Sequence, residues 1–503
     1  MPQCVFNGSE RLAAISVSPV PIPPPKPLEE GEEPPEGETE ESRKSAALDA
    51  AAELINGELG KALTGLHTAK TLEVDDKISL IEGSPKYVVS MAIAQAAASM
   101  AGMPLHAFIA SYNKEMVETA HGNIGGGVAV KVGDEEKDKV GMDGTVIDKV
   151  KSANTESAEA DKPTGPKPGT TVRLPAPIFP GLAAGPAVEG AAVKMRGFWL
   201  VGKRDLQYEK SLPQLIKVHQ KMGAMLAEKY PGEGAEVPRE DGAYNCKQMA
   251  SVDEVMGFIE EAVSGCELSL GEDVKVLVDL GATSFFVKNT GEVGTYVYKP
   301  DEDSAVEADA WPEWVDGFLS KFPSVTAIND AVAKDDYETW RKLRQLIGGG
   351  SGGGEKGVCL FGDDLFNDDL DTIRAGVAEG WAAGAMLRPE VLGTLTNVTD
   401  AVCLFTALQP EASRVILHHR AGLEAGGADA DLAVGLGAWG IMCGSPGPLM
   451  TGKINRLIKV QEELQEAAAA GLCEVVTWED TYAREKEAMQ QIADLAQTAA
   501  AGP

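Results

Sequence analysis

Polar side chains stand at the ends of short apolar runs in the second half of the chain. One run, VKVLVDL, ends in Asp279; the next two, SVTAIND and VCLFGDD, end in Asn329–Asp330 and Asp363–Asp364. Carboxylate and amide oxygens are the ligands that hard divalent cations such as Mg²⁺ prefer. A single aspartate at such a place is more often a cap of the following helix. Three successive runs that end in this way favour a divalent metal site.

Basic side chains end two of the later runs. Arg388 ends AAGAMLR, and His419 and Arg420 end RVILHHR. A guanidinium group donates two parallel hydrogen bonds to a phosphate or a carboxylate, so a pair of arginines suits an anionic ligand. These residues favour a site at the ends of the runs, and an anionic ligand bound through them is one alternative.

The elements that must position these side chains are buried strands that alternate with helices. From Leu174 to about Gly444, short apolar runs without polar alternation are separated by helical stretches such as DDYETWRKLRQLI and LDTIRAGVAEGW. This alternation is typical of a parallel sheet covered by helices, and the number of repeats favours a closed barrel. Because all strands of a parallel barrel end at one mouth, residues that are distant in sequence meet there.

The chain before the barrel divides into three segments. Residues 1–44 include a run of prolines and glutamates that is expected to be disordered, because proline lacks a backbone donor and the glutamates repel one another. Residues 45–112 are expected to be helical, with an apolar stretch at 87–110 that is buried on most faces. Residues 113–172 are expected to form an insertion, with a hairpin at 121–150 and then a mobile loop.

The barrel itself is expected to span residues 173–470, with a flexible glycine loop at 348–354. Residues 471–503 are expected to form a helical extension that begins with a capping box from Thr477 to Asp480. Its apolar stripe would pack on its own domain; a less favoured alternative is a docking helix.

The composition limits the function classes. The 503 residues have a net charge of −32, which disfavours binding to nucleic acid and to anionic membranes. Such acidity serves solubility or suits basic protein partners. Seven cysteines without a CxxC pair indicate neither a zinc site nor a disulfide framework, and fit a reducing compartment. The start lacks a signal core and no apolar run spans a membrane, so we expect a cytoplasmic location.

Five motifs together resemble enolase, the phosphopyruvate hydratase family: GDDL (362–365), LGTLT (392–396), HHRAG (418–422), ADADLAVGL (428–436) and IKVQEELQ (458–465). The resemblance runs from about Ser45 to Leu464 and is interrupted by the insertion. It implies an α/β fold, with an enolase-type (βα)8-like barrel and a reduced, mostly helical N-terminal domain. In that family three carboxylates hold Mg²⁺, a lysine removes a proton from carbon and a glutamate helps to expel the hydroxyl group.

The resemblance places the metal ligands at Asp279, Asn329 and Asp363. Because the family has a glutamate where this chain has Asn329, one negative charge is lost, and Mg²⁺ binding is expected to be weakened. The catalytic lysine is replaced by Arg388. A guanidinium group stays protonated and has no lone pair that accepts a proton, so it cannot act as the general base.

The resemblance also assigns residues to the substrate. The family's His-Arg-Ser phosphate motif corresponds to His419, Arg420 and Ala421, and a second substrate-binding lysine corresponds to Met442. The positions of two family glutamates correspond to Asp241 and to Lys210, which follows Glu209. The family's loop histidine and closing loop have no counterpart.

These changes predict a pseudoenzyme: an enolase barrel that is kept as a structural or interaction subunit with protein partners in a larger assembly. The long insertion resembles the enolase-like proteins of sperm and motile cilia, which implies a component of the axoneme, such as its central apparatus. Whether the family's homodimer is kept is left open. The alternative is an active or weakly active Mg²⁺-dependent hydratase of glycolysis, or a site that binds another anion through Arg388, His419 and Arg420.

Overall fold

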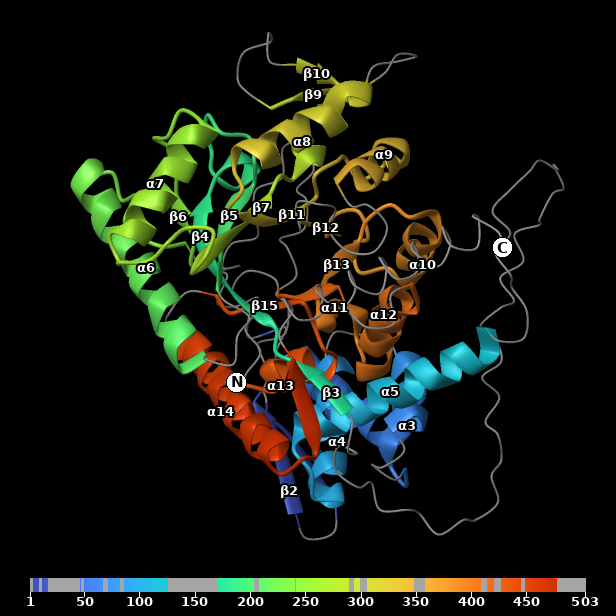
Figure 1. Ribbon diagram of the computed structural model, residues 1–503. Coiled ribbons are helices and arrows are strands. Elements are labelled where there is room, and N and C mark those ends of the chain that lie inside the picture. The colour runs from blue at the N-terminus through green and yellow to red at the C-terminus, as the bar shows by residue number, and fades with distance from the viewer. Residues whose placement is uncertain are drawn as a thin grey trace, which may run out of the picture.

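The computed structural model describes residues 3–8, 11–16, 46, 49–66, 71–81, 86–124, 170–202, 208–239, 241–288, 294–298, 305–347, 358–408, 414–419, 427–444 and 448–476. Its centre is a closed barrel (Figure 1). The barrel strands are β4 (Ala176–Ala183), β5 (Gly197–Gly202), β7 (Val274–Asp279), β11 (Val325–Asn329), β12 (Cys359–Gly362), β13 (Gly384–Leu387), β14 (Val415–Leu417) and β15 (Gly440–Met442). Because β15 pairs with β4, the sheet closes on itself, and the expected α/β barrel is confirmed.

Strand β5 differs from the expected parallel arrangement. It runs antiparallel to both of its neighbours, β4 and β7, whereas the other neighbouring barrel strands are parallel. The segment between β4 and β5 contains only the short 3-10 helix η2 (Gly185–Ala187), and a parallel connection ordinarily needs a longer crossover with a helix. The beginning of β5, and not its end, therefore lies at the mouth of the barrel, the end at which the parallel strands finish.

Helices cover the outside of the barrel (Figure 1). They are α6 (Tyr208–Lys229), α7 (Val252–Ser264), α8 (Trp311–Lys321), α9 (Tyr337–Ile347), α10 (Leu370–Glu379), α11 (Pro389–Leu392), α12 (Leu395–Leu408), α13 (Ala428–Gly435) and α14 (Pro448–Ala469). Shorter elements are β6 (Tyr244–Asn245), which pairs with β4, the small sheet of β8 (Phe286–Val287), β9 (Thr295–Val297) and β10 (Ala305–Glu307), and the 3-10 helices η3 (Ala282–Phe285) and η5 (Ala308–Ala310).

Two cores lie on the two faces of the barrel sheet. The inner core contains Leu277, Phe361 and Trp439, and the rings of Phe361 and Trp439 lie edge to face with centroids 5.2 Å apart. The outer core, between strands and helices, contains the alternate residues Val276 and Val278. Since both faces of each strand are buried, the strands read as continuous apolar runs in the sequence.

The N-terminal region is mostly helical, as expected. Its helices are η1 (a π-helical turn, Ile55–Leu59), α2 (Gly60–Leu63), α3 (Thr71–Ser79), α4 (Lys86–Ala101) and α5 (Leu105–Ile124). The apolar stretch at 87–110 is not one helix, because α4 and α5 are bent by 102° at the break before Leu105. Most of α4 is buried, in agreement with its apolar composition.

The first residues of the chain differ from the expected disorder. Strands β1 (Gln3–Gly8) and β2 (Arg11–Ser16) form an antiparallel hairpin whose last pair joins Gly8 to Arg11. A two-residue link is the commonest connection in hairpins, but Ser9–Glu10 lacks the glycine or asparagine that marks such a turn in a sequence. The proline- and glutamate-rich residues 17–42 lie outside the described residues.

The expected insertion begins and ends in regular structure. Helix α5 continues to Ile124, and β3 (Thr170–Arg173) precedes the barrel. Strand β3 pairs in parallel with β16 (Cys473–Val476), so the two ends of the barrel domain lie side by side (Figure 1). The predicted hairpin at 121–150 beyond Ile124, the glycine loop at 348–354 and the C-terminal helix after residue 476 lie outside the described residues.

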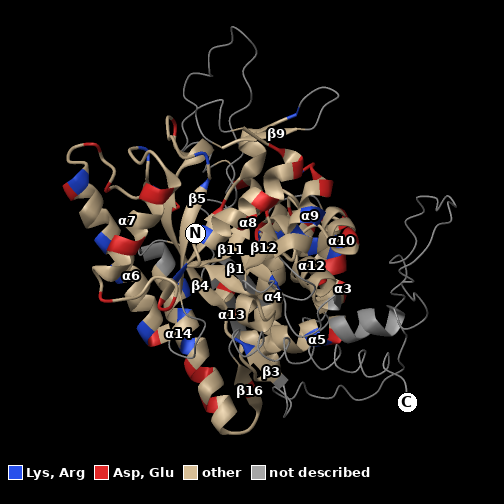
Figure 2. Ribbon diagram, turned by 45° about the horizontal axis from the view of Figure 1, so that its top comes forward, with Lys and Arg blue, Asp and Glu red and all other residues tan. Residues whose placement is uncertain are grey.

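Residues of both charges lie along outer helices such as α6, α7 and α14 (Figure 2). Within the part of the chain that the structure describes, no single helix is long and apolar enough to cross a membrane. By length and composition alone, only α4 and α5 taken together as a bent pair would pass such a test.

Candidate active site at the barrel mouth

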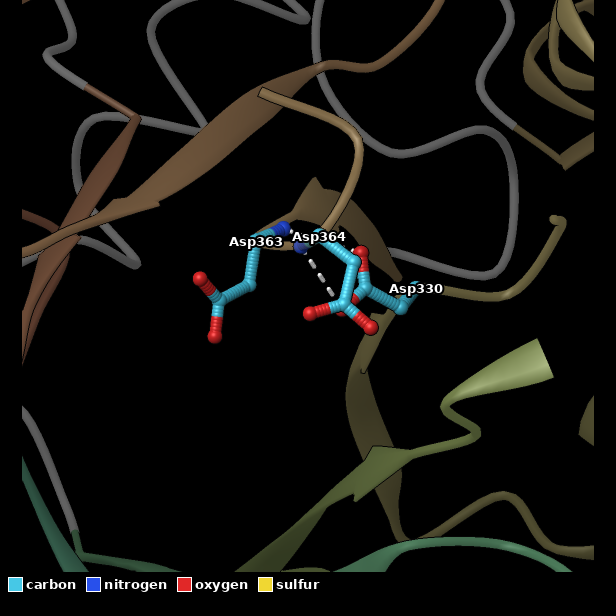
Figure 3. A group of neighbouring side chains, drawn as sticks. All are labelled: Asp330, Asp363 and Asp364. Carbon is cyan, nitrogen blue, oxygen red and sulfur yellow. Dashed lines mark hydrogen bonds between the residues drawn. The ribbon is translucent and has the colours of Figure 1, made fainter. Parts of the chain in front are cut away.

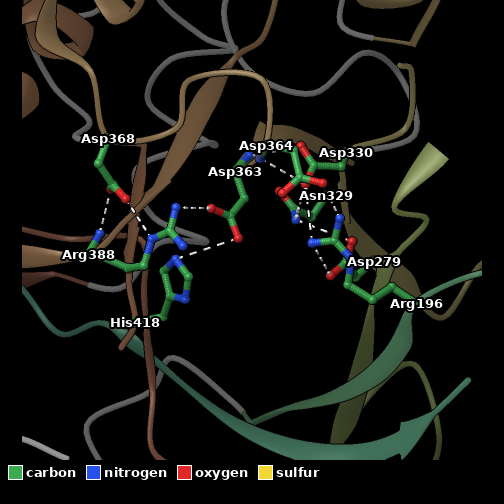
Figure 4. Close-up of polar contacts among 9 residues, drawn as sticks. All are labelled: Arg196, Asp279, Asn329, Asp330, Asp363, Asp364, Asp368, Arg388 and His418. Carbon is green, nitrogen blue, oxygen red and sulfur yellow. Dashed lines mark hydrogen bonds and ion pairs between the residues drawn. The ribbon is translucent and has the colours of Figure 1, made fainter. Parts of the chain in front are cut away.

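The three predicted metal positions meet at the mouth, as the parallel strands require (Figure 4). Asp279 is the last residue of β7, Asn329 is the last residue of β11, and Asp363 follows β12. All three are buried. The side chain of Asn329 donates from Nδ2 to Oδ1 of Asp279 over 3.3 Å and to Oδ2 of Asp330 over 3.2 Å. The amide nitrogen of Asn329, and not its oxygen, therefore faces the carboxylates.

Arg196 is a site residue that the sequence did not reveal. It directly precedes β5, and the pairing of Gly197 with Asp279 places it at the mouth. Its Nη1 lies 3.5 Å from Oδ2 of Asp279 and 3.6 Å from Oδ2 of Asp330, and its Nη2 forms a very short contact with Asp364. Arg196 stands at the beginning of an apolar run, whereas the predicted metal ligands stand at or near the ends of such runs.

Asp330 positions the loop after β12 (Figure 3). Its Oδ1 accepts the backbone N–H of Asp363 over 2.9 Å, and its Oδ2 accepts that of Asp364 over 3.1 Å. The backbone of Asp330 has a φ of 42°, in the left-handed region that few side chains other than those of Asp and Asn tolerate. Asp330 thus fixes the two carboxylates that follow the neighbouring strand.

Arg388, which the resemblance places at the position of the catalytic lysine, is held by two carboxylates. Its backbone N–H and its Nε donate to Asp368 over 2.8 and 2.5 Å, and its Nη2 lies 3.3 Å from Oδ1 of Asp363. Burial lowers the pKa of Arg388, but Asp363 and Asp368 outweigh burial and raise this pKa above its ordinary value. The guanidinium group therefore stays charged and offers no lone pair to a proton.

His418 faces the mouth, whereas its neighbour His419 does not. The Nε2 of His418 lies 3.7 Å from Oδ2 of Asp363. Side chains alternate along a strand, and Ile416 belongs to the inner core while Leu417 belongs to the outer one. The same alternation carries His418 to the inner side and His419 to the outer side of β14.

His419 is enclosed by acidic groups between the barrel and its helices. Its Nδ1 lies 2.8 Å from Glu390, and its Nε2 lies 2.6 Å from Asp429 on α13. Asp429 also accepts the hydroxyl of Tyr87 on α4 over 2.9 Å. Burial lowers the pKa of His419, but Asp429 and Glu390 together raise this pKa to about 9. Both ring nitrogens thus face carboxylates, and neither is directed at a substrate. Arg420 and Ala421 lie outside the described residues.

The remaining predicted positions are spread over the barrel. Met442 ends β15 at the mouth, and its carbonyl accepts Nζ of Lys453 over 3.0 Å. Asp241 lies three residues before β6, close to the mouth end of β4, and its carboxylate binds the backbone N–H of Ala243 and the side chain of Arg239.

Glu209 and Lys210 are not brought to the mouth. They lie in the first turn of α6, where the hydroxyl of Tyr208 donates to the carbonyl of Pro175, directly before the start of β4. Because β4 ends at the mouth, its start marks the opposite end of the barrel. Glu209 accepts Nε2 of Gln461 on α14 over 2.6 Å, a contact between helices. The sequence could not show this, since the position of α6 depends on the reversed direction of β5.

The donor set at the mouth does not fit an Mg²⁺ ion bound by Asp279, Asn329 and Asp363. Asp279 faces Arg196, Asp363 faces Arg388 and His418, and Asn329 presents its amide nitrogen. Among the described residues, Asp330, Asp363 and Asp364 have carboxylate oxygens within 4.8 Å of one another. However, Asp330 and Asp364 of this group already pair with Arg196.

Negative charge exceeds positive charge in this part of the mouth. Burial, together with the neighbouring Asp363 and Asp364, raises the pKa of Asp279 to about 7, although Arg196 acts in the opposite direction. Burial and the same acidic neighbours raise the pKa of Asp330 well above its ordinary value, against the effect of Arg196. Arg196 therefore favours the ionised form of both carboxylates, against burial and their mutual repulsion.

The comparison with known families agrees with this architecture. Residues 171–475 match the family described as "Enolase, C-terminal TIM barrel domain". The matched range covers more than half of the chain and contains all the barrel strands as well as Arg196, Asp279, Asp363 and Arg388. By its sequence and by its closed barrel, the chain belongs to the enolase family.

Proposed function

We propose that this protein is a pseudoenzyme: an enolase-fold protein without phosphopyruvate hydratase activity, which acts as a structural or interaction subunit. The observation that supports this proposal best is the state of Arg388. Its guanidinium group occupies the base position and is held between Asp368 and Asp363 over 2.5 and 3.3 Å.

The chemistry of the family's reaction explains why this observation supports the proposal. Removing a proton from a carbon atom requires a base with a free lone pair, and general acid–base catalysis contributes about 10²–10⁴-fold to the rate. Arg388 lacks that lone pair, and the two flanking carboxylates favour its charged form. Met442, at a substrate-lysine position, supplies no charge to bind the substrate.

A weakly active hydratase is the second candidate, because the mouth keeps part of the family's acidic set. Asp279 and Asp363 remain at the strand ends where the family binds metal. A residual activity would then depend on one of these carboxylates, or on His418, as the proton acceptor.

The test is a coupled assay with 2-phosphoglycerate and Mg²⁺ on the purified full-length chain. We expect no turnover above that of an Arg388→Gln control, which has no basic group at this position. Turnover close to that of ordinary enolases would refute the proposal. The change Arg388→Lys alone is expected to restore nothing, because Asn329 and Met442 would still leave out a metal-binding carboxylate and a substrate-binding lysine. Activity in Arg388→Lys combined with Asn329→Glu and Met442→Lys would support the proposal strongly.

The cellular part of the proposal is a cytoplasmic protein of the ciliary axoneme, bound to protein partners. It is supported by the resemblance of the insertion-bearing sequence to the enolase-like proteins of sperm and motile cilia, and by a net charge of −32 that suits basic partners. Fractionation of cilia tests it. We expect the protein to stay with the detergent-extracted axoneme and to leave it at high salt. Recovery only in the soluble matrix fraction would contradict this assignment.

A further inference from the structure

We propose that Arg196 takes the place of a divalent metal ion at the barrel mouth, so that the mouth keeps its carboxylates together without Mg²⁺. This inference goes beyond the proposed loss of activity. An inactive barrel can still bind Mg²⁺, so the binding experiment described below can fail while the assay described above supports the loss of activity.

The first support is the set of contacts that Arg196 makes (Figure 4). Its guanidinium group reaches three carboxylates that come from three successive segments of the barrel. Asp279 ends β7, Asp330 directly follows β11, and Asp364 lies in the loop after β12. Asp279 and Asp330 are almost completely buried, so their mutual repulsion is not screened by water. One planar cation that forms ion pairs with all three joins these segments in the way a bound metal ion would.

The second support is the space that the protein leaves for this side chain. Gly281, which follows β7 closely, has a φ of 55°. A Cβ atom added at Gly281 would lie 2.8 Å from Nε and 3.1 Å from Cβ of Arg196. The backbone of Arg196 is fixed as well, because its carbonyl accepts the N–H of Ala184 over 3.0 Å. The surrounding backbone therefore fixes the position of Arg196 within the mouth.

The third support is competition for the same carboxylates. A magnesium ion requires close, nearly octahedral contact with oxygen atoms, and it is repelled by a neighbouring guanidinium group. To bind between Asp279, Asp330 and Asp364, the ion would have to displace Arg196 and break all three ion pairs. The remaining carboxylate, Asp363, is turned toward Arg388 and His418.

The experiment is a titration with Mn²⁺ as a spectroscopic probe of the Mg²⁺ site, together with melting curves in EDTA and in millimolar MgCl₂. For the unmodified chain we expect no stoichiometric Mn²⁺ binding, and the same melting temperature in both buffers at equal ionic strength. For Arg196→Gln we expect a lower melting temperature in EDTA that Mg²⁺ raises again, because the freed carboxylates then bind the ion. The matched control is Arg341→Gln, which removes an exposed ion pair with Glu379 and should respond to neither buffer.

Two results would overturn the proposal. The first is stoichiometric Mn²⁺ binding by the unmodified chain that Asp279→Asn abolishes, which would show that the ion and Arg196 share the mouth. The second is an Arg196→Gln variant that is as stable as the parent and indifferent to Mg²⁺. If this variant folds only when Mg²⁺ is present, the proposal is supported. If it folds in neither buffer, the titration of the unmodified chain decides.

Discussion

Replacing Asp429 with asparagine should remove the centre of a buried charge network that joins the N-terminal helices to the barrel. Asp429 is 1 % exposed and contacts the hydroxyl of Tyr87 on α4, Nε2 of His419 after β14 and Nζ of Lys453 on α14, the last over 3.7 Å. Asparagine has nearly the same shape as aspartate, and its side-chain oxygen can still accept a hydrogen bond from the hydroxyl of Tyr87. The substitution therefore tests the charge, while most of the packing is preserved.

The structure gives two ways to work out the magnitude. Breaking a buried ion pair by neutralising one partner costs about 3–5 kcal/mol, because the other charge remains without compensation. A histidine whose pKa rises from 6.5 to about 9 on folding is stabilised in its charged form by about 3 kcal/mol. Since Glu390 stays beside His419 in the variant, we expect a loss near the lower end, about 3 kcal/mol at pH 6.

The loss should depend on pH in a defined direction. The pKa of His419 is higher in the folded protein than in the unfolded chain, so the folded state binds this proton more tightly. The resulting stabilisation is complete below pH 6.5 and disappears as the pH rises through about 9. The difference between the parent and Asp429→Asn should therefore shrink between these two values. Groups that titrate in both proteins, such as Asp279, cancel in the comparison.

The assay is urea denaturation of both proteins at a series of pH values, with Asp371→Asn as the control. Asp371 forms an ion pair with Arg374 on the surface of α10, and its loss should change the free energy of unfolding by less than about 1 kcal/mol. A loss of less than about 1 kcal/mol for Asp429→Asn at pH 6 would refute the reasoning. So would a difference that stays constant up to pH 10, well above the pKa of about 9.

Two further predictions concern glycines. Gly384→Ala in β13 should lower the free energy of unfolding by about 3 kcal/mol, because the new Cβ atom would lie 2.2 Å from the carbonyl oxygen of Arg414. Gly257→Ala inside α7 should instead raise it by about 0.5–1 kcal/mol, because the new Cβ atom meets nothing within 4 Å. If urea denaturation gave the same change in the free energy of unfolding for both variants, this prediction would be contradicted. Gly281→Ala should cost at least about 1–2 kcal/mol, since it combines a left-handed backbone with a clash against Arg196; a neutral effect would mean that Arg196 does not occupy the position described.

The sequence predicted the barrel because most of its strands are buried on both faces. The runs at β7, β11, β12, β13, β14 and β15 stand out as apolar segments between helices. Strand β4 is less visible, because it contains Pro177 and Pro180, which are unusual within a sheet. The direction of a strand is not encoded in its apolar run, so the reversal of β5 could not be predicted from composition.

The same reversal explains most of what was missed at the site. Asp279, Asn329 and Asp363 were predicted at the mouth because they end parallel strands. Arg196 was missed because it begins an antiparallel one, and Lys210 was assigned to the site although α6 starts at the far end of the barrel.

The histidine pair illustrates a signal that the sequence did contain. Residues two apart on a strand face the same side, so the inward Ile416 predicts an inward His418. The same alternation, continued past the end of β14, predicts that His418 faces inward and His419 faces outward. What it would not have shown is the charge of His419, which depends on Asp429 from a distant helix.

The pairing of β3 with β16 has a consequence for synthesis of the chain. It joins Thr170–Arg173, at the start of the barrel domain, to Cys473–Val476, at its end. The pair cannot form until residue 476 has left the ribosome, so β3 presents an unpaired edge until synthesis of the domain is complete. Contacts between residues so distant in sequence also slow folding, and an unpaired edge invites association with other chains. In a chain that terminates before Cys473, the edge of β3 would stay unpaired permanently.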